Sequence, residues 1–89
     1  MIRIYLGVVE KDPDSAWGMW FPDMPGCFPA VDDFDDLPRA AAELLREHVD
    51  ALKRYGIAIP GPRSITEAMA DKEVRRSLKA GATTMLVAS

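Results

Sequence analysis

The chain has 89 residues, 48% hydrophobic and 28% charged, which is typical of one small folded domain and unlike a disordered chain. Eleven basic and fourteen acidic residues give a net charge of −3, which argues against direct nucleic-acid binding because such binding requires a concentrated basic surface. No apolar run reaches the roughly 18 residues of a membrane span, and the N-terminus has no cleavage site of a signal peptide. The single cysteine permits no intrachain disulfide, so we expect a cytoplasmic protein.

Two strands are predicted at the N-terminus. Apolar residues alternate over positions 2–8, a turn cluster occupies 11–15, and a second strand follows at 16–21, so an antiparallel hairpin is expected. In the second strand Trp17 and Phe21 share the face that we expect to enter the core, and Trp20 points to the other face. We expect Tyr5 to accompany Trp20 there, as an exposed aromatic pair that anchors an interface, unless the connector or the C-terminal segment covers it.

A stiff loop follows the hairpin. Residues 21–27 read FPDMPGC, and Pro22 and Pro25 end the strand because proline offers no N–H to the ladder. Gly26 can adopt the positive φ of a tight turn. Residues 27–31 predict a short third strand, placed at an edge by Pro29.

The remaining pattern predicts helices and one more strand. An amphipathic helix is expected over residues 37–55, capped by an aspartate among residues 33–36 and ended by Gly56. After a stiff connector at 59–64, the capping-box pattern from Ser64 to Glu67 opens a second helical stretch, which Asp71 restarts. Residues 82–89 predict the last strand. The order β-β-β-α-α-β indicates an α+β fold with a three-to-four-stranded, mainly antiparallel sheet and helices on one face.

Three kinds of catalytic site are suggested by the residue types present. Cys27 and His48 are the only residues of their types and suggest a nucleophilic pair, but no third orienting residue is visible, and a structural cysteine is the alternative. Five aspartates, at 23, 32, 33, 35 and 36, suggest a Mg²⁺-dependent nuclease. They lie in loops or at a helix start, where capping explains them. A zinc site lacks the necessary ligand spacing. The pattern therefore predicts no catalytic residue, no metal and no cofactor.

The order of these motifs resembles the HicB antitoxin family. The similar pieces are the opening strand, W-x-x-x-FPD-x-PGC at residues 17–27, the long helix, IP-x-P-x-S at residues 59–64, the short helix and the closing strand. The family entry to the long helix usually reads Gly-Asp-Thr, whereas this chain has VDDFDDLPRA. Many family members also carry a C-terminal DNA-binding domain, for which residues 1–89 have no counterpart.

The resemblance implies a partial ribonuclease H-like fold in a single domain, residues 1–89. It also implies homo-oligomers, dimers or tetramers, and neutralisation of a small basic messenger-RNA-cleaving toxin of the HicA family. The function predicted is therefore that of an antitoxin which occludes a HicA-like toxin without chemistry of its own. The alternatives are an oligomeric binding or scaffold module without a toxin and, third, a nuclease. The residues predicted to bind a partner are Tyr5, Trp20, Asp23, Met24, Asp32 and Asp33.

Overall fold

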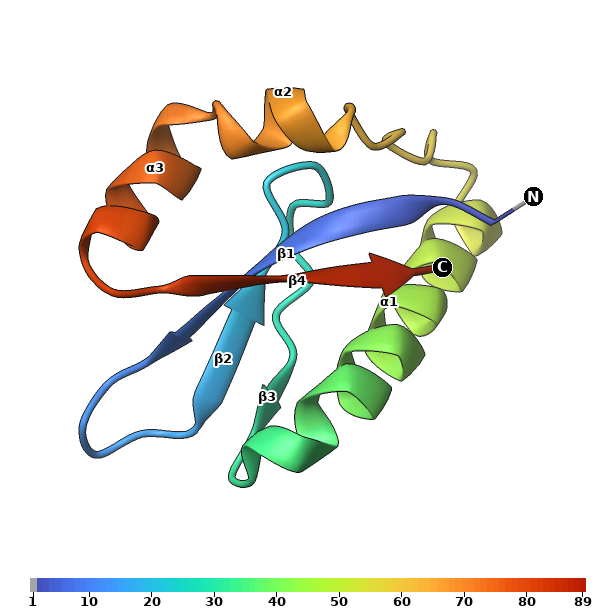
Figure 1. The fold of residues 1–89 in the computed structure, drawn as a ribbon. Helices are drawn as coiled ribbons and strands as arrows, with labels where there is room; N and C mark the ends of the chain where they lie inside the picture. Colours follow the sequence, from blue (N-terminus) through green and yellow to red (C-terminus); the bar gives the residue numbers. More distant parts are fainter. Residues whose placement is uncertain (1) are drawn as a thin grey trace.

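The computed structural model describes residues 2–89. Its four strands form one antiparallel sheet in the order β3-β2-β1-β4 (Figure 1). The elements are β1 (Ile4–Lys11), β2 (Trp17–Trp20), β3 (Ala30–Val31), the single-turn helix η1 (Phe34–Asp36), α1 (Leu37–Arg54), α2 (Ile65–Met69), α3 (Lys72–Lys79) and β4 (Thr83–Ala88). The predicted α+β class and element order are confirmed. Among residues 2–89, no helix has the length and apolarity needed to cross a bilayer.

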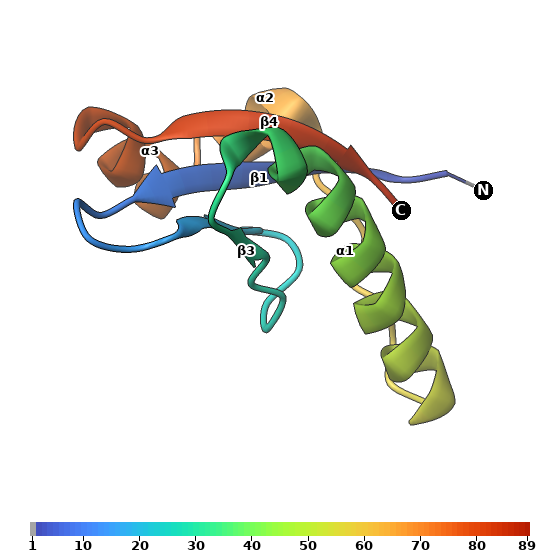
Figure 2. The ribbon, with the colours of Figure 1, turned by 90° about the horizontal axis from the view of Figure 1, so that it is seen from below.

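The sheet separates two helical layers (Figure 2). Helix α1 covers one face through Leu37, Ala41 and Leu45, which are fully buried. Helices α2 and α3 cover the opposite face through Ala68 and Val74. The prediction that all helices share one face is therefore wrong. The helices lie on both faces because β1 is a central strand whose side chains alternate between two apolar faces, and each face requires a helical layer to cover it.

Strand β1 shows this double burial directly, because five consecutive residues, 5–9, are buried. Cα pairing of Val9 with Met19, and of Val8 with Trp20, sets which side chains share a face. Val9 and Met19 lie in the cluster under α1, whereas Val8 and Trp20 lie in the cluster under α2 and α3. A strand covered on both sides reads as a continuous apolar run, with little alternation to reveal its faces.

The exposed position predicted for Tyr5 is wrong. Tyr5 is 0% exposed and lies in the α1 cluster, on the face opposite Trp20. Its hydroxyl donates a hydrogen bond of 2.5 Å to the carbonyl of Pro60 in the connector. Tyr5 therefore holds the connector against the sheet through a contact between residues that are 55 positions apart in the sequence.

Local capping explains where the helices begin. Asp33 accepts a hydrogen bond from the Asp35 N–H (3.0 Å) and so caps η1, which leads into α1. The aspartate predicted to cap the long helix thus caps η1 instead, and α1 itself begins after Asp36 without a side-chain cap. Ser64 and Glu67 form the predicted capping box, with bonds of 3.1 and 3.2 Å. Asp71 caps α3 by accepting from the N–H groups of residues 73 and 74. These bonds satisfy donors that a helix start otherwise leaves free.

The third strand is shorter than predicted. Only Ala30 and Val31 pair with β2, whereas residues 27–31 were expected to form the strand. Pro29 has no N–H, so it contributes only its carbonyl, which accepts from the Met19 N–H at 2.9 Å. The predicted edge position of this strand is confirmed.

We predict that Tyr5→Phe lowers the free energy of unfolding by about 1 kcal/mol, the usual net contribution of one hydrogen bond. The substitution removes the bond to Pro60 and leaves the ring packing unchanged. Urea denaturation followed by tryptophan fluorescence measures the change. Tyr55→Phe is the matched control, since Tyr55 is 74% exposed and should give no change. Equal stability of both variants and the parent chain would show that the bond to Pro60 contributes nothing.

Candidate partner-binding site

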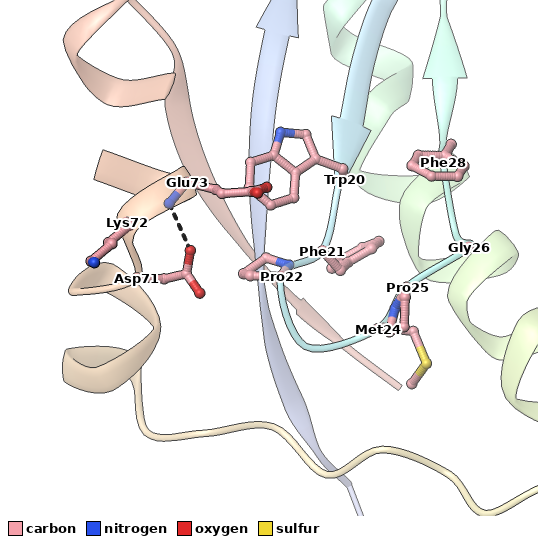
Figure 3. Close-up of a pocket in the computed structure, with 10 residues that line it drawn as sticks. All are labelled: Trp20, Phe21, Pro22, Met24, Pro25, Gly26, Phe28, Asp71, Lys72 and Glu73. Carbon is pink, nitrogen blue, oxygen red and sulfur yellow. Dashed lines mark hydrogen bonds between the residues drawn. The ribbon is translucent and has the colours of Figure 1, made fainter. Parts of the chain in front are cut away.

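An open groove of about 590 Å³ lies between the loop after β2 and the start of α3 (Figure 3). One wall comes from β2 and the loop, and the other from the first residues of the α3 region. The residues that line it are Trp20, Phe21, Pro22, Met24, Pro25, Gly26, Phe28, Asp71, Lys72 and Glu73. Most of these are apolar, so the groove offers a hydrophobic surface with charges on one side.

Two aromatic rings dominate the accessible part of the groove. Phe28 is 68% exposed, and Figure 3 shows its ring on the loop side, across from Trp20. Trp20 is half-buried: its ring packs against the cluster under α3, and its indole N–H donates to the Glu10 carboxylate. Protein-binding surfaces are enriched in aromatic side chains, which often contribute most of the affinity. An exposed Phe28 beside Trp20 is typical of such a surface.

The loop that carries Phe28 is held in a single shape. Pro22 and Pro25 restrict its backbone, and Gly26 adopts φ +87°, a conformation that side-chain-bearing residues rarely adopt. A Cβ at position 26 would also come within 3.4 Å of the His48 ring of α1. The loop is therefore fixed against α1 on one side, while Phe28 points away from the core.

Arg63 joins the two walls of the groove. Its Nε donates to Asp23 Oδ1 at 2.6 Å, and its backbone N–H donates to Asp23 Oδ2 at 3.1 Å. Its guanidinium also donates to Asp71 Oδ2 at 3.1 Å. Asp23 belongs to the loop and Asp71 caps α3, so one side chain from the connector sets the distance between loop and helix. Charge-assisted bonds of this kind are stronger than neutral ones.

This cluster shifts the pKa of Asp71. The hydrogen bond from Arg63 lowers the pKa of the Asp71 carboxyl, and the two N–H groups at the start of α3 lower it further. Burial acts in the opposite direction. Asp71 therefore stays ionised at neutral pH, as both its capping role and its ion pair require.

The predicted partner-binding residues do not form one surface. Met24, like Tyr5, is 0% exposed, so the surface position predicted for both is wrong: each fills the core under α1. The Asp23 side chain is 8% exposed and is engaged by Arg63. Asp32 and Asp33 are exposed but follow Val31, which pairs with Trp17 at the end of β2 remote from Trp20. Partner binding by Trp20, Asp32 and Asp33 stays a prediction.

Sequence reasoning missed Phe28, Arg63 and Asp71 as parts of this site. Phe28 was assigned to a strand, although its place between Cys27 and Pro29 in a proline-rich loop was a usable signal. Arg63 and Asp23 are 40 residues apart in the sequence, and no periodic pattern predicts a contact between them.

The residues considered for catalysis do not assemble into a reactive site. Cys27 is buried, and burial raises the pKa of its thiol, which disfavours the nucleophilic thiolate. His48 lies beside Gly26, yet no hydrogen bond joins it to Cys27 among the residues described. Within residues 2–89, no three His, Cys, Asp or Glu side chains are grouped so that they could hold a metal ion.

Proteins of known family and solved structures share this sequence pattern and fold. The sequence model of the HicB-like antitoxin of bacterial toxin-antitoxin systems matches residues 5–87. A solved structure of a HicA3 and HicB3 toxin-antitoxin complex contains a chain with 27% identity and a TM-score of 0.76, covering 94% of both chains. The antitoxin HicB of Burkholderia pseudomallei matches with 28% identity and a TM-score of 0.73 over 94% of this chain, which spans 61% of that protein. A toxin-antitoxin complex from Streptococcus pneumoniae, at 16% identity and a TM-score of 0.73, shares the fold over 99% of this chain and 69% of that one. Comparison with curated protein sequences gives no match.

We predict that Arg63→Met lowers the urea midpoint at pH 7, because Asp23 and Asp71 lose their shared cation. Since the pKa of Asp71 is depressed in the folded chain, its ion pair contributes stability above the ordinary pKa of an aspartate. This contribution begins to fall near the ordinary aspartate pKa of about 4 and is lost as the pH falls through the depressed value, so the parent and Arg63→Met should converge only at the acidic end of that range.

Arg39→Met is the matched control for this experiment. Arg39 pairs with Asp36 at 3.4 Å, but both side chains are more than half exposed, and such pairs contribute little. If Arg39→Met costs as much as Arg63→Met at pH 7, the Arg63 cluster has no special role.

Proposed function

This chain belongs to the HicB-like antitoxin family of bacterial toxin-antitoxin systems, and on that premise we propose that it binds a HicA-like toxin and covers its active site. The family indicates a non-enzymatic role. The proposal needs no cofactor and no nucleic-acid contact by this chain, and both proteins would meet in the cytoplasm, where messenger RNA is translated.

We further propose that the toxin docks in the groove between the loop and α3. The observation that carries this is Phe28, a large aromatic side chain left 68% exposed on a loop that is otherwise rigid. A rigid, exposed aromatic loses little conformational freedom on binding, so most of its buried area contributes to affinity. Trp20 and the prolines extend the same apolar surface.

Carboxylates beside the groove suit a basic partner. Glu10 and Glu73 line a smaller hollow that also contains Trp20 and Phe28. Arg76 lines the same hollow, so the hollow is not uniformly acidic. Attraction of a basic toxin would depend on where its cations lie relative to Glu10 and Glu73. In such a docking the rings supply affinity, and the carboxylates supply orientation and the rate of encounter.

We predict that Phe28→Ala weakens binding of a cognate HicA-like toxin by at least about tenfold, the effect of a typical aromatic hot spot. The same variant should fail to relieve growth arrest on co-expression. Isothermal titration calorimetry measures the affinity, and Tyr55→Ala is the matched control because Tyr55 is an equally exposed aromatic at the end of α1.

Two outcomes would contradict this proposal in different ways. If the parent chain neither binds such a toxin nor relieves growth arrest, the antitoxin function is wrong. If it binds but Phe28→Ala binds equally well, the function stands and the toxin docks on another surface.

The second candidate is an oligomeric module whose sheet continues into a second copy, and strand β4 favours it. Strand β4 is an edge of the sheet, and its sequence TTMLVA contains no charge or proline of the kind that protects edges. Leu86 is 56% exposed, and Ile4, which lies diagonally to it on the same face of β1, is 42% exposed. Helices α2 and α3 contact β1 and leave this strip of the sheet open. We propose that two copies pair through β4 about a twofold axis.

We predict that Leu86→Lys converts the β4-paired dimer to a monomer, because the apolar side chain at the pairing edge is replaced in each copy by a positive charge. Sedimentation velocity at micromolar concentration measures the mass. Tyr55→Lys, which adds the same charge outside the sheet, should leave the dimer unchanged. A parent chain that is already monomeric would exclude pairing through β4.

A further inference from the structure

Helix α3 carries a concentrated positive charge that the net charge of −3 conceals. Lys72, Arg75, Arg76 and Lys79 are spaced i, i+3, i+4 and i+7, so they share one face of the helix. All four are exposed, and together they line a hollow of about 280 Å³. We call these four residues the α3 cations.

The α3 cations are not used within the chain. The ion pairs formed among residues 2–89 are Arg39 with Asp36 and Arg63 with Asp23 and Asp71. None involves an α3 cation. Four like charges on an eight-residue helix repel one another, so this face has free energy to gain from an acidic partner.

The same chain presents such an acidic partner elsewhere. Asp32, Asp33, Asp35 and Asp36 lie within five residues around η1, and all four are exposed. We call residues 32–36 the acidic segment. Asp33 caps η1, which gives the segment a defined shape, while Asp32 and Asp35 offer carboxylates that accept no hydrogen bond from residues 2–89.

The α3 cations and the acidic segment cannot neutralise each other within one molecule. Helix α3 covers the sheet face opposite α1, whereas the acidic segment leads into α1 at the β3 edge (Figure 1). No ion pair joins them among residues 2–89. We propose that the α3 cations of one copy dock onto the acidic segment of a second copy.

If two copies are related by a twofold axis, this contact forms a closed dimer. The α3 cations of each copy then contact the acidic segment of the other. The interface contains the charge pairs twice and leaves neither surface free to bind a third copy. The inference does not rest on toxin binding. It adds an interface distinct from the uncharged β4 edge, and the two together would build a tetramer from a dimer.

Salt dependence distinguishes this contact from apolar pairing. Exposed ion pairs are weak singly and are screened by salt. We therefore expect the charge-dependent association constant to fall at least about tenfold between roughly 50 mM and 500 mM NaCl. Pairing through β4 should change little over the same range.

The decisive experiment is a charge exchange between two variants, followed by sedimentation equilibrium at about 50 mM NaCl. Arg75→Glu/Arg76→Glu takes the charge of the four helix positions from +4 to 0, and Asp32→Lys/Asp35→Lys takes that of the four aspartate positions from −4 to 0. Each variant alone should lose the association, because one side of both contacts is then neutral. An equimolar mixture should regain one of the two contacts, because the unchanged helix of one variant meets the unchanged acidic segment of the other.

The control is Arg46→Glu/Lys53→Glu, which changes the net charge as much as the helix variant but on α1. It should leave the association intact, and thermal unfolding should show that every variant is folded. A mixture that stays dissociated, or a parent chain whose mass does not depend on salt, would overturn the proposal. So would an unchanged mass combined with loss of affinity for a single-stranded RNA oligonucleotide in the helix variant, since α3 would then be a nucleic-acid surface.

Discussion

The burial of β1 on both faces is the constraint on which the rest of the structure depends. Residues 5–9 of this strand are all buried, and a single helical layer can cover only the side chains of one face. Helix α1 covers Tyr5 and Val9, and the α2–α3 pair covers Leu6 and Val8. A domain of 89 residues thereby obtains two small clusters of buried residues in place of one large core.

The second helical layer creates the candidate site. Once α3 is placed over Val8 and Trp20, the space between its first turn and the FPDMPG loop becomes the groove. The connector that delivers α2 to this face crosses close to the loop, so Arg63 can reach Asp23 and Asp71 together. The groove is therefore a consequence of how the chain passes from one face of the sheet to the other.

Three surfaces of the same small domain differ in charge, although the groove and the α3 cations share Lys72. The groove is apolar with mixed charges at one side, the β4 edge is uncharged, and the α3 cations and the acidic segment are of opposite sign at different places. Each surface suits a different kind of contact, since apolar burial supplies affinity, strand edges supply hydrogen bonds, and charge supplies orientation and salt sensitivity.

The sequence by itself determined the order of elements, the caps of α2 and α3 and the family, because these depend on residues close together in the chain. The box from Ser64 to Glu67 and the cap at Asp71 form as predicted for this reason. Only the tertiary structure decided that Tyr5 and Trp20 face opposite layers, because that depends on the register of β1 with β2 and on a second helical layer. It also brought Arg63 to Asp23 across 40 residues, a contact that arises from the path of the chain and leaves no periodic signal.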